Sequence, residues 1–188
     1  MRDTQPTLES PGIFRLQDAG GIGLTRGRLR GMIRRGEAEK VGRGLYRRVS
    51  VATVCARVPG AIVCLLTALL IHRIGTQLPP DVWIALDRRA RTPRLEALPV
   101  HIVRFSGPML RYGIEERRVQ GVAVRITSPA RTVVDCFRYR NKIGIDVALE
   151  ALKDSLRTRR TSVDAIVRAA QMCRMDNVLR PYLEAIVV

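Results

Sequence analysis

The sequence has little that points to a membrane or to secretion. Its longest apolar run covers residues 61–71, whereas a bilayer-spanning helix needs about 20 apolar residues. The N-terminal sequence MRDTQPTLES has no apolar core of the kind that a secretory signal peptide contains. We therefore expect a cytoplasmic protein in which residues 61–75 form a core helix.

The sequence also lacks the common motifs of metal sites and catalysis. It contains only four cysteines and two histidines, and no CxxC pair, so the ligand spacing of a structural zinc site is missing. P-loop, GxSxG and HExxH motifs do not occur, and neither does a DxD or DxE pair that could hold Mg²⁺ in a nucleotidyltransferase. We expect no metal, no cofactor, no catalytic residues and no enzyme activity, with the thiols buried and free: Cys55, Cys64, Cys136 and Cys173.

Several single residues could suggest chemistry, but each has a simpler structural interpretation. Glu150 and Lys153 resemble part of a nuclease motif, yet their spacing on a predicted helix suits a surface ion pair. Asp135 lies three or four residues from an arginine on either side, which favours a helix-orienting ion pair with Arg131 or Arg138. Three further residues are predicted to be packed or hydrogen-bonded: His72, His101 and Trp83.

The charge balance points to a polyanionic partner. The formal net charge is +16, from 33 basic and 17 acidic residues, and a value so far from zero favours nucleic acid as a partner. Only three of the basic residues are lysines, and arginine is suited to bidentate contacts with phosphate and guanine. A GC-rich genome would produce the same arginine bias without any role in recognition.

The first fifty residues show the order of elements of a winged helix-turn-helix, after a flexible arm at 1–11. Apolar residues at helical spacing over 13–19 predict a short helix, and the glycines that follow predict a turn. Thr25 can cap a second helix over 26–35. Two short strands at 37–41 and 45–49, joined by glycines, then predict a hairpin wing. We assign the winged helix-turn-helix domain to residues 12–50.

The second helix of this domain is predicted to read DNA. Leu29 falls on one side of the helix while Arg30 and Arg34 fall on the other, which gives an apolar back and a basic front. The first turn of such a helix usually meets base edges, and a wing contacts phosphates. The alternative is a solvated basic face with no ligand. The predicted DNA-binding residues are Thr25, Arg26, Arg28, Arg30, Arg34, Arg35, Lys40, Arg43 and Arg47.

The rest of the chain predicts an α/β (α+β) domain. A linker is expected at 51–58, and the domain is assigned to residues 59–188. Strands are predicted at 82–86, 100–105 and 121–126, and helices at 129–138, 143–156, 162–172 and 177–186, the first of them capped by Ser128. A second basic cluster on the late helices could extend a DNA footprint, meet an acidic partner, or be solvated: Arg157, Arg159, Arg160 and Arg168.

The run GIFRLQDAGGIGLTRGRLRGMIRRGEAEKVGRGLYRR resembles the winged-helix domain of the AbiEi family, the antitoxins of type IV toxin-antitoxin and abortive-infection systems. The segments AIVCLLTALLIHRIG, LPPDVWIAL, VRITSPARTVVDCFRYRNKIGIDVALEAL and RPYLEAI resemble the family's partner domain in the same order, so the resemblance covers about residues 12–187. The SPARTVVDCFR block is its most specific part.

The resemblance implies a transcriptional repressor that binds inverted repeats of double-stranded DNA in its own promoter, with two or more copies possible on the DNA. It also implies a functional partner, a nucleotidyltransferase-type toxin that is countered without a tight complex. Two alternatives stay open: an interaction protein whose C-terminal domain neutralises the toxin directly, and a nuclease fused to a winged helix.

Overall fold

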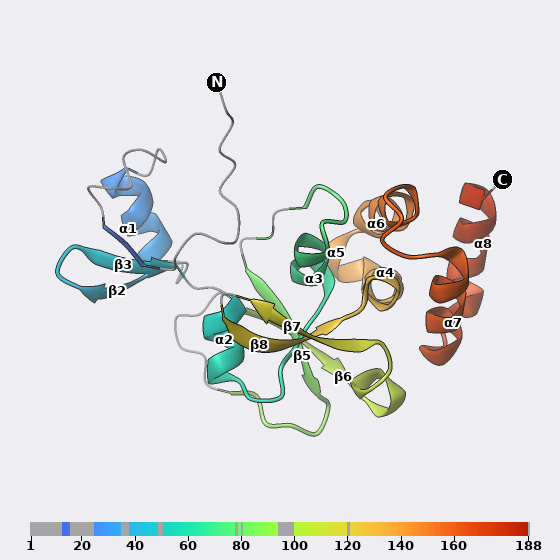
Figure 1. Cartoon of the computed structure of the whole chain (residues 1–188), viewed down its shortest axis with the longest axis horizontal. Helices are drawn as coiled ribbons and strands as arrows, with labels where there is room; N and C mark the ends of the chain where they lie inside the picture. Colours follow the sequence, from blue (N-terminus) through green and yellow to red (C-terminus); the bar gives the residue numbers. More distant parts are fainter. Residues whose placement is uncertain are drawn as a thin grey trace.

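The computed structural model shows a mixed α/β protein with one small and one larger β-sheet (Figure 1). It describes residues 13–15, 25–34, 38–48, 51–77, 79, 81–93, 100–119 and 121–187. The predicted arm at 1–11 lies outside these residues. The mixed α/β fold class is confirmed, and among the described residues no helix is long and apolar enough to cross a membrane.

The small sheet is built from the N-terminal segment. Its strands are β1 (Ile13–Arg15), β2 (Ala38–Gly42) and β3 (Leu45–Arg48), all antiparallel and in the order β1-β3-β2, and helix α1 (Arg26–Arg34) precedes the hairpin. The predicted second helix and hairpin are therefore confirmed. The predicted helix at 13–19 is wrong for residues 13–15, because these pair with β3, and a short apolar run does not by itself distinguish a strand from a helix. Residues 16–19 lie outside the described part.

The larger sheet has five strands in the order β6-β5-β4-β8-β7. The predicted strands correspond to β5 (Val82–Asp87), β6 (Val100–Phe105) and β8 (Val122–Thr127), which are confirmed. Strand β7 (Ile114–Val119) was not predicted, because its four consecutive charged residues hide the alternating pattern of a strand. Residues 61–75 were predicted to form one helix, but β4 (Ile62–Val63) pairs with β5 and β8 before α3 (Leu65–His72) begins.

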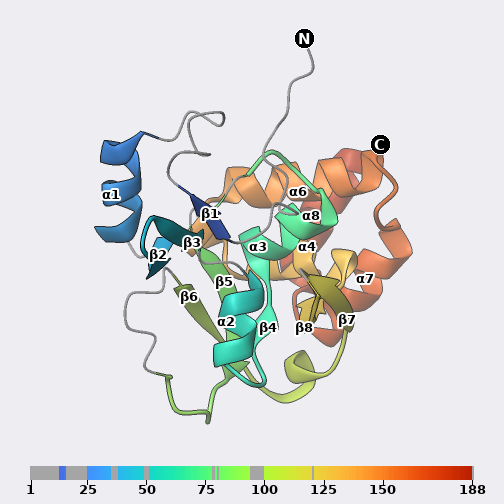
Figure 2. The same cartoon turned by 60° about the vertical axis from the view of Figure 1, so that its left-hand side comes forward.

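Residues 51–58 were expected to form a linker but contain helix α2 (Val51–Arg57). The side chains of Val51, Val54 and Val58 are buried in a core cluster with Ile84 and Ile126 of the larger sheet. Figure 2 shows α2 in front of the strands, on the side away from the C-terminal helices. The segment is thus packed structure, because its valines lie at helical spacing and gain burial against the sheet.

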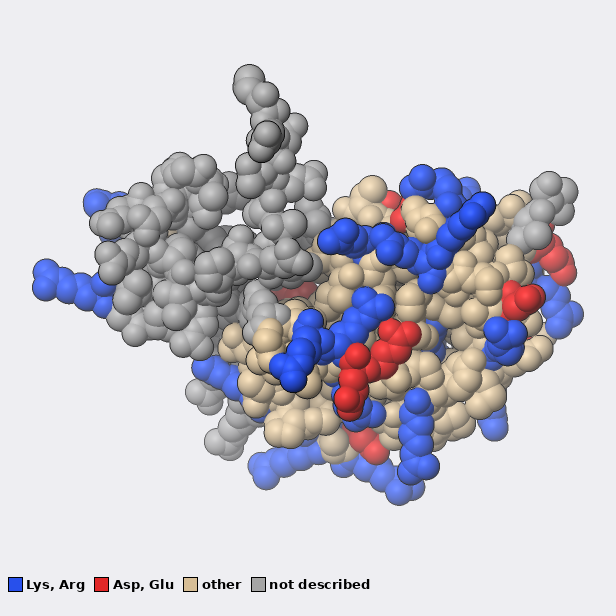
Figure 3. Space-filling view, viewed as in Figure 1, with Lys and Arg blue, Asp and Glu red and all other residues tan. Residues whose placement is uncertain are grey.

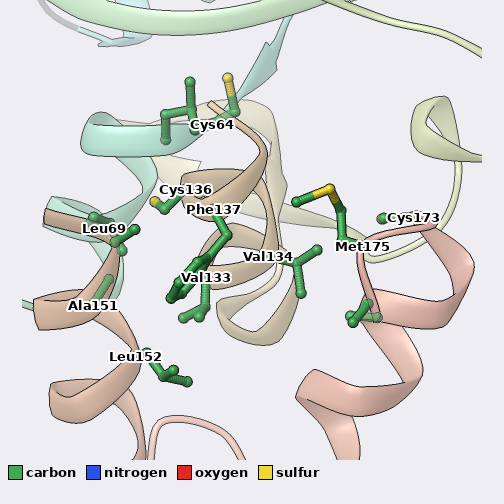
Figure 4. Packing of buried hydrophobic residues seen from close by; sticks show 14 of the residues in the cluster. Cys64, Leu69, Val133, Val134, Cys136, Phe137, Ala151, Leu152, Cys173 and Met175 are labelled. Carbon is green, nitrogen blue, oxygen red and sulfur yellow. The ribbon is translucent and has the colours of Figure 1, made fainter. Parts of the chain in front are cut away.

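The other face of the sheet is covered by helices arranged around α4 (Pro129–Arg138), which packs against α3, α6 and α7. The remaining helices are α5 (Arg140–Ile143), α6 (Ile145–Arg157), α7 (Val163–Met172), α8 (Asp176–Val187) and the 3₁₀ helix η2 (Gly107–Leu110). Figure 4 shows the side chains of α4 between Leu69 of α3, Leu152 of α6 and Met175 after α7. The predicted cap is present, because the Ser128 side chain accepts a hydrogen bond from the backbone N–H of Arg131.

Candidate nucleic-acid interface

Helix α1 has a buried side and a basic side. Its first turn is closed by a backbone hydrogen bond of 2.9 Å from Leu29 N–H to the Thr25 carbonyl, and the Leu29 side chain is 2% exposed. Thr25, Arg26 and Arg30 are exposed. Since residues four apart lie on the same helix face, the side chains of Arg26 and Arg30 extend from one exposed surface, next to the side on which Leu29 is buried.

The β2–β3 hairpin carries a further exposed arginine at its tip. Arg43 and Gly44 form the turn, and Gly44 has φ +72° with open space around it, a conformation that glycine adopts at little cost. The register of the hairpin shifts between Lys40 and Gly42, which indicates a β-bulge and therefore a stronger local twist. The hairpin presents Arg43 to solvent.

The structure places part of the predicted DNA-binding set. Thr25, Arg26, Arg30 and Arg43 are exposed on α1 and the hairpin tip. For four others the structure gives the position in an element but not the side chain: Arg28, Arg34, Lys40 and Arg47. Arg35 lies outside the described residues. Their function as a set stays a prediction.

The second basic cluster lies at the end of α6, in the turn that follows it and in the middle of α7. Arg157, Arg159, Arg160 and Arg168 are all exposed, and Figure 3 shows several blue side chains over the region where Figure 1 labels α6. Arg157 is paired with Asp154 at 2.5 Å, and the other oxygen of Asp154 accepts a 2.8 Å hydrogen bond from Gly75 N–H. Part of the basic charge is therefore balanced within the molecule.

Asp135 forms an ion pair with Arg131, one of the two arginines predicted as its partner, and the pair is completely buried. Its Oδ1 accepts a 2.9 Å hydrogen bond from Arg131 Nε, and both side chains are 0% exposed. Burial raises the pKa of Asp135 to about 6, although the guanidinium of Arg131 acts in the opposite direction. Because solvent does not reach the carboxylate, the pair is suited to holding α4 in place rather than to contacting a substrate.

Arg131 connects α4 to the segment between β6 and β7, which sequence reasoning did not foresee. Its guanidinium donates to the carbonyl oxygens of Met109 and Tyr112, at 3.3 and 2.8 Å, and lies 4.9 Å from the centre of the Phe105 ring. The SPART part of the SPARTVVDCFR block therefore has a structural role here. The sequence pattern that could have predicted this role is Arg131 itself, a charged residue in a helix turn whose other residues face the core.

The two histidines and the tryptophan have structural surroundings, as expected. His72 is buried, and its Nε2 donates to the Thr127 carbonyl at 2.6 Å; burial lowers its pKa. The exposed His101 is hydrogen-bonded to Asp81 at 2.8 Å and stacks on Trp83 with 4.3 Å between ring centres. Trp83 is 8% exposed and belongs to the main core.

The predicted surface ion pair between Glu150 and Lys153 is replaced by a different interaction. The Glu150 carboxylate accepts hydrogen bonds from the backbone and hydroxyl groups of Thr76 and from the Gln77 amide, at 2.9, 2.7 and 3.2 Å. These bonds lower its pKa. The tertiary fold brings the loop after α3 against α6, and this loop supplies better-aligned donors than a flexible lysine.

All four thiols are free, as predicted, and the predicted burial is confirmed for Cys64, Cys136 and Cys173, whereas Cys55 is only half-buried. Burial raises the pKa of Cys55 to about 11, so its reactive thiolate form is scarce at neutral pH. Within the described ranges, no group of three or more His, Cys, Asp and Glu residues is placed to hold a metal ion.

Comparison with known proteins identifies the N-terminal segment. Residues 7–49 match the model of a family described as "Transcriptional regulator, AbiEi antitoxin". This range contains β1, α1 and the β2–β3 hairpin, the elements that carry the exposed Arg26, Arg30 and Arg43. No curated protein matches the chain. The family resemblance is confirmed over residues 7–49, which are similar to the AbiEi antitoxin family of transcriptional regulators.

Proposed function

We propose that the protein is a sequence-specific DNA-binding repressor that acts as the antitoxin of a type IV toxin-antitoxin system. It regulates its own operon by binding inverted repeats in the promoter. The observation that carries the proposal is that the family match at 7–49 coincides with a helix and a hairpin whose exposed residues include Arg26, Arg30 and Arg43. The sheet order β1-β3-β2 behind one helix is also compatible with a winged helix over residues 12–50.

In this function, α1 enters the major groove and the hairpin follows the phosphate backbone. The exposed guanidinium groups of Arg26 and Arg30 would meet base edges and phosphates, while Arg43 at the hairpin tip would contact the backbone or the minor groove. The buried Leu29 side chain keeps the helix packed against its own domain. The protein would act by binding alone, without catalysis and without a cofactor.

The direct test is a footprint of the DNA upstream of the protein's own gene, at 50 and 200 mM salt. We expect a protected inverted repeat. If six to ten basic side chains contact phosphates, affinity should fall by roughly 10³- to 10⁵-fold between these salt concentrations. Absence of a protected repeat, or a complex that is insensitive to salt, would contradict the proposal.

A matched pair of variants tests the assignment of the interface. Arg26→Gln/Arg30→Gln removes two charges from α1, and Arg174→Gln/Arg180→Gln removes two exposed charges near α8. The first variant should lose sequence-specific binding, and the second should keep it. Equal effects of the two variants would mean that net charge, and not α1, determines binding.

A nucleotidyltransferase-type toxin is the proposed functional partner, countered without a tight complex. Pull-down of the neighbouring gene product with the full chain separates this from direct neutralisation by the C-terminal domain. Stable stoichiometric capture would favour direct neutralisation. Incubation with DNA and Mg²⁺ tests the nuclease alternative, which cleavage would support.

A further inference from the structure

The outer strand β7 carries equal numbers of acidic and basic residues in a fixed order. It lies at one end of the sheet order and pairs with β8. Its sequence IEERRV places two glutamates before two arginines. Glu116, Arg117 and Arg118 are exposed, and Figure 3 shows red and blue side chains next to one another where Figure 1 labels β7 and β8. A sheet edge of this kind can accept another strand.

The pairing with β8 determines which backbone groups of β7 point outward. Ser128 N–H donates to the Gly113 carbonyl at 2.8 Å, so this pair is a hydrogen-bonded one. In an antiparallel ladder hydrogen-bonded and non-hydrogen-bonded pairs alternate. The backbone N–H and C=O groups of the odd-numbered residues in β7 therefore bond to β8. The same groups of the even-numbered residues Ile114, Glu116 and Arg118 point away from β8.

These outward groups restrict how two copies of β7 could pair. In an antiparallel pair, two directly opposite residues must both point their backbone N–H and C=O groups towards the other strand, or both point them away. When a two-fold axis relates the strands, this condition requires the axis to pass through a residue, which then faces the same residue of the second copy. With the axis at Glu116, the outward groups of the two strands bond to each other. Glu115 then lies opposite Arg117 of the second copy, twice by symmetry, at the closely spaced non-hydrogen-bonded positions.

The charges fit this register. Opposite charges at directly facing positions stabilise a pair of strands. Within one copy Arg117 pairs with Glu115 of its own strand at 3.4 Å, so in the pair of strands the two Glu115 and two Arg117 side chains would form one network of alternating charge. Glu116 faces its own mate, but Arg118 of the second copy is its diagonal neighbour on the same face. Moving the axis to Arg117 would place two arginines at the closely spaced positions, where like charges repel.

We propose that β7 is a self-association surface, and that two copies of the chain join their five-stranded sheets through antiparallel β7–β7 pairing centred on Glu116. The order of charges on β7 selects a second copy over other occupants. A purely acidic or purely basic edge would repel its own copy, whereas the two acidic and two basic residues of β7 can pair with those of a second copy. The β7 edge is neutral in sum, although the whole chain carries +16.

Cysteine cross-linking of the full chain tests the register. In Glu116→Cys the two new thiols face each other across a hydrogen-bonded pair with Cα atoms about 5.5 Å apart, within the range of about 4.4–6.8 Å for a disulfide. In the matched control Arg118→Cys the two positions lie four residues apart along the strands, about 14 Å. We expect a disulfide dimer with Glu116→Cys and none above wild-type background with Arg118→Cys. Equal yields from the two variants would overturn the proposal.

Charge exchange tests the complementarity by a second route. Glu115→Arg/Glu116→Arg makes the edge basic, and Arg117→Glu/Arg118→Glu makes it acidic. Sedimentation equilibrium should show the dimer dissociation constant of each variant raised at least tenfold over wild type, whereas an equimolar mixture should form a heterodimer. Circular dichroism checks that both variants fold. A mixture that stays monomeric, or single variants that dimerise as wild type does, would overturn the proposal. The proposal does not depend on DNA binding, so its failure would leave the proposed function intact.

Discussion

The buried pair of Arg131 and Asp135 gives the sharpest test of how the C-terminal part of the chain is held together. Arg131→Met keeps an unbranched apolar stem but removes the guanidinium. In this variant the Asp135 carboxylate, whose side chain is 0% exposed, loses its ion-pair partner. The carbonyl oxygens of Met109 and Tyr112 also lose the hydrogen bonds that Arg131 donates. Removing one partner of a buried ion pair costs about 3–5 kcal/mol, a large share of the roughly 5–15 kcal/mol by which a domain is stable.

Urea unfolding can measure this cost directly. Trp83 is the only tryptophan in the chain and lies in the same core cluster as α4, so its fluorescence reports on the relevant region. We expect Arg131→Met to lose about 3–5 kcal/mol of unfolding free energy. Arg131→Met/Asp135→Leu should lose less than the single variant, because no uncompensated charge remains. A loss below about 1 kcal/mol for Arg131→Met, the value of an exposed ion pair, would refute the structural role.

The same pair predicts a dependence on pH. Burial raises the pKa of Asp135 to about 6 in the folded protein, above the value of about 3.9 for an unfolded chain. The folded state then binds more protons than the unfolded state between these values, so unfolding free energy falls as the pH rises from 4 to 6. Asp135→Asn should remove this fall. An unchanged pH profile in that variant would contradict the assignment.

Three further predictions concern single sites, each measured by urea or thermal unfolding of the full chain. Gly113→Ala should lower the unfolding free energy by about 2 kcal/mol or more, because φ is +63° and the new Cβ would lie 2.9 Å from the Cβ of Arg131. The control Gly121→Ala, at φ +81° in open space, should lower it by about 1 kcal/mol. Equal losses in the two variants would argue against the close contact. Burial lowers the pKa of His72 below its unfolded value, so the wild type should lose unfolding free energy as the pH falls below about 6.5. His72→Gln should abolish this loss. A loss that persists in the variant would show that another group causes it. Ser128→Ala should cost about 1 kcal/mol through the lost helix cap, and no loss would show that the cap is replaced by solvent.

Sequence patterns predicted best where a local signal decides the structure. The strands β5, β6 and β8, the hairpin after α1 and the cap at Ser128 were all predicted from alternation, glycine placement and capping residues. The pairing of Asp135 with an arginine also follows from a spacing of four residues on one helix. Each of these depends on neighbours within a few residues, so the chain itself carries the information.

The errors have a common cause in long-range contacts. Residues 13–15 are a strand because β3 provides hydrogen-bond partners 30 or more residues away, and β4 is a strand because it lies between β5 and β8. Residues 51–57 form a helix packed on the sheet instead of a linker, since Val54 gains burial only when the sheet is present. Strand β7 was not predicted because it lies at the edge of the sheet, where charged residues occur on both of its faces.

The net charge, the basic side of α1, the hairpin that follows it and the resemblance of residues 7–49 to the AbiEi family all follow from residue types at short spacing. The roles of the remaining polar residues emerge only in the folded protein. The tertiary structure buries Arg131 at the junction of α4 with the β6–β7 segment, turns Glu150 towards the loop after α3, and places β7 at the open edge of the sheet. These roles depend on segments that meet only when the chain folds, because burial and strand pairing are properties of the whole packed domain.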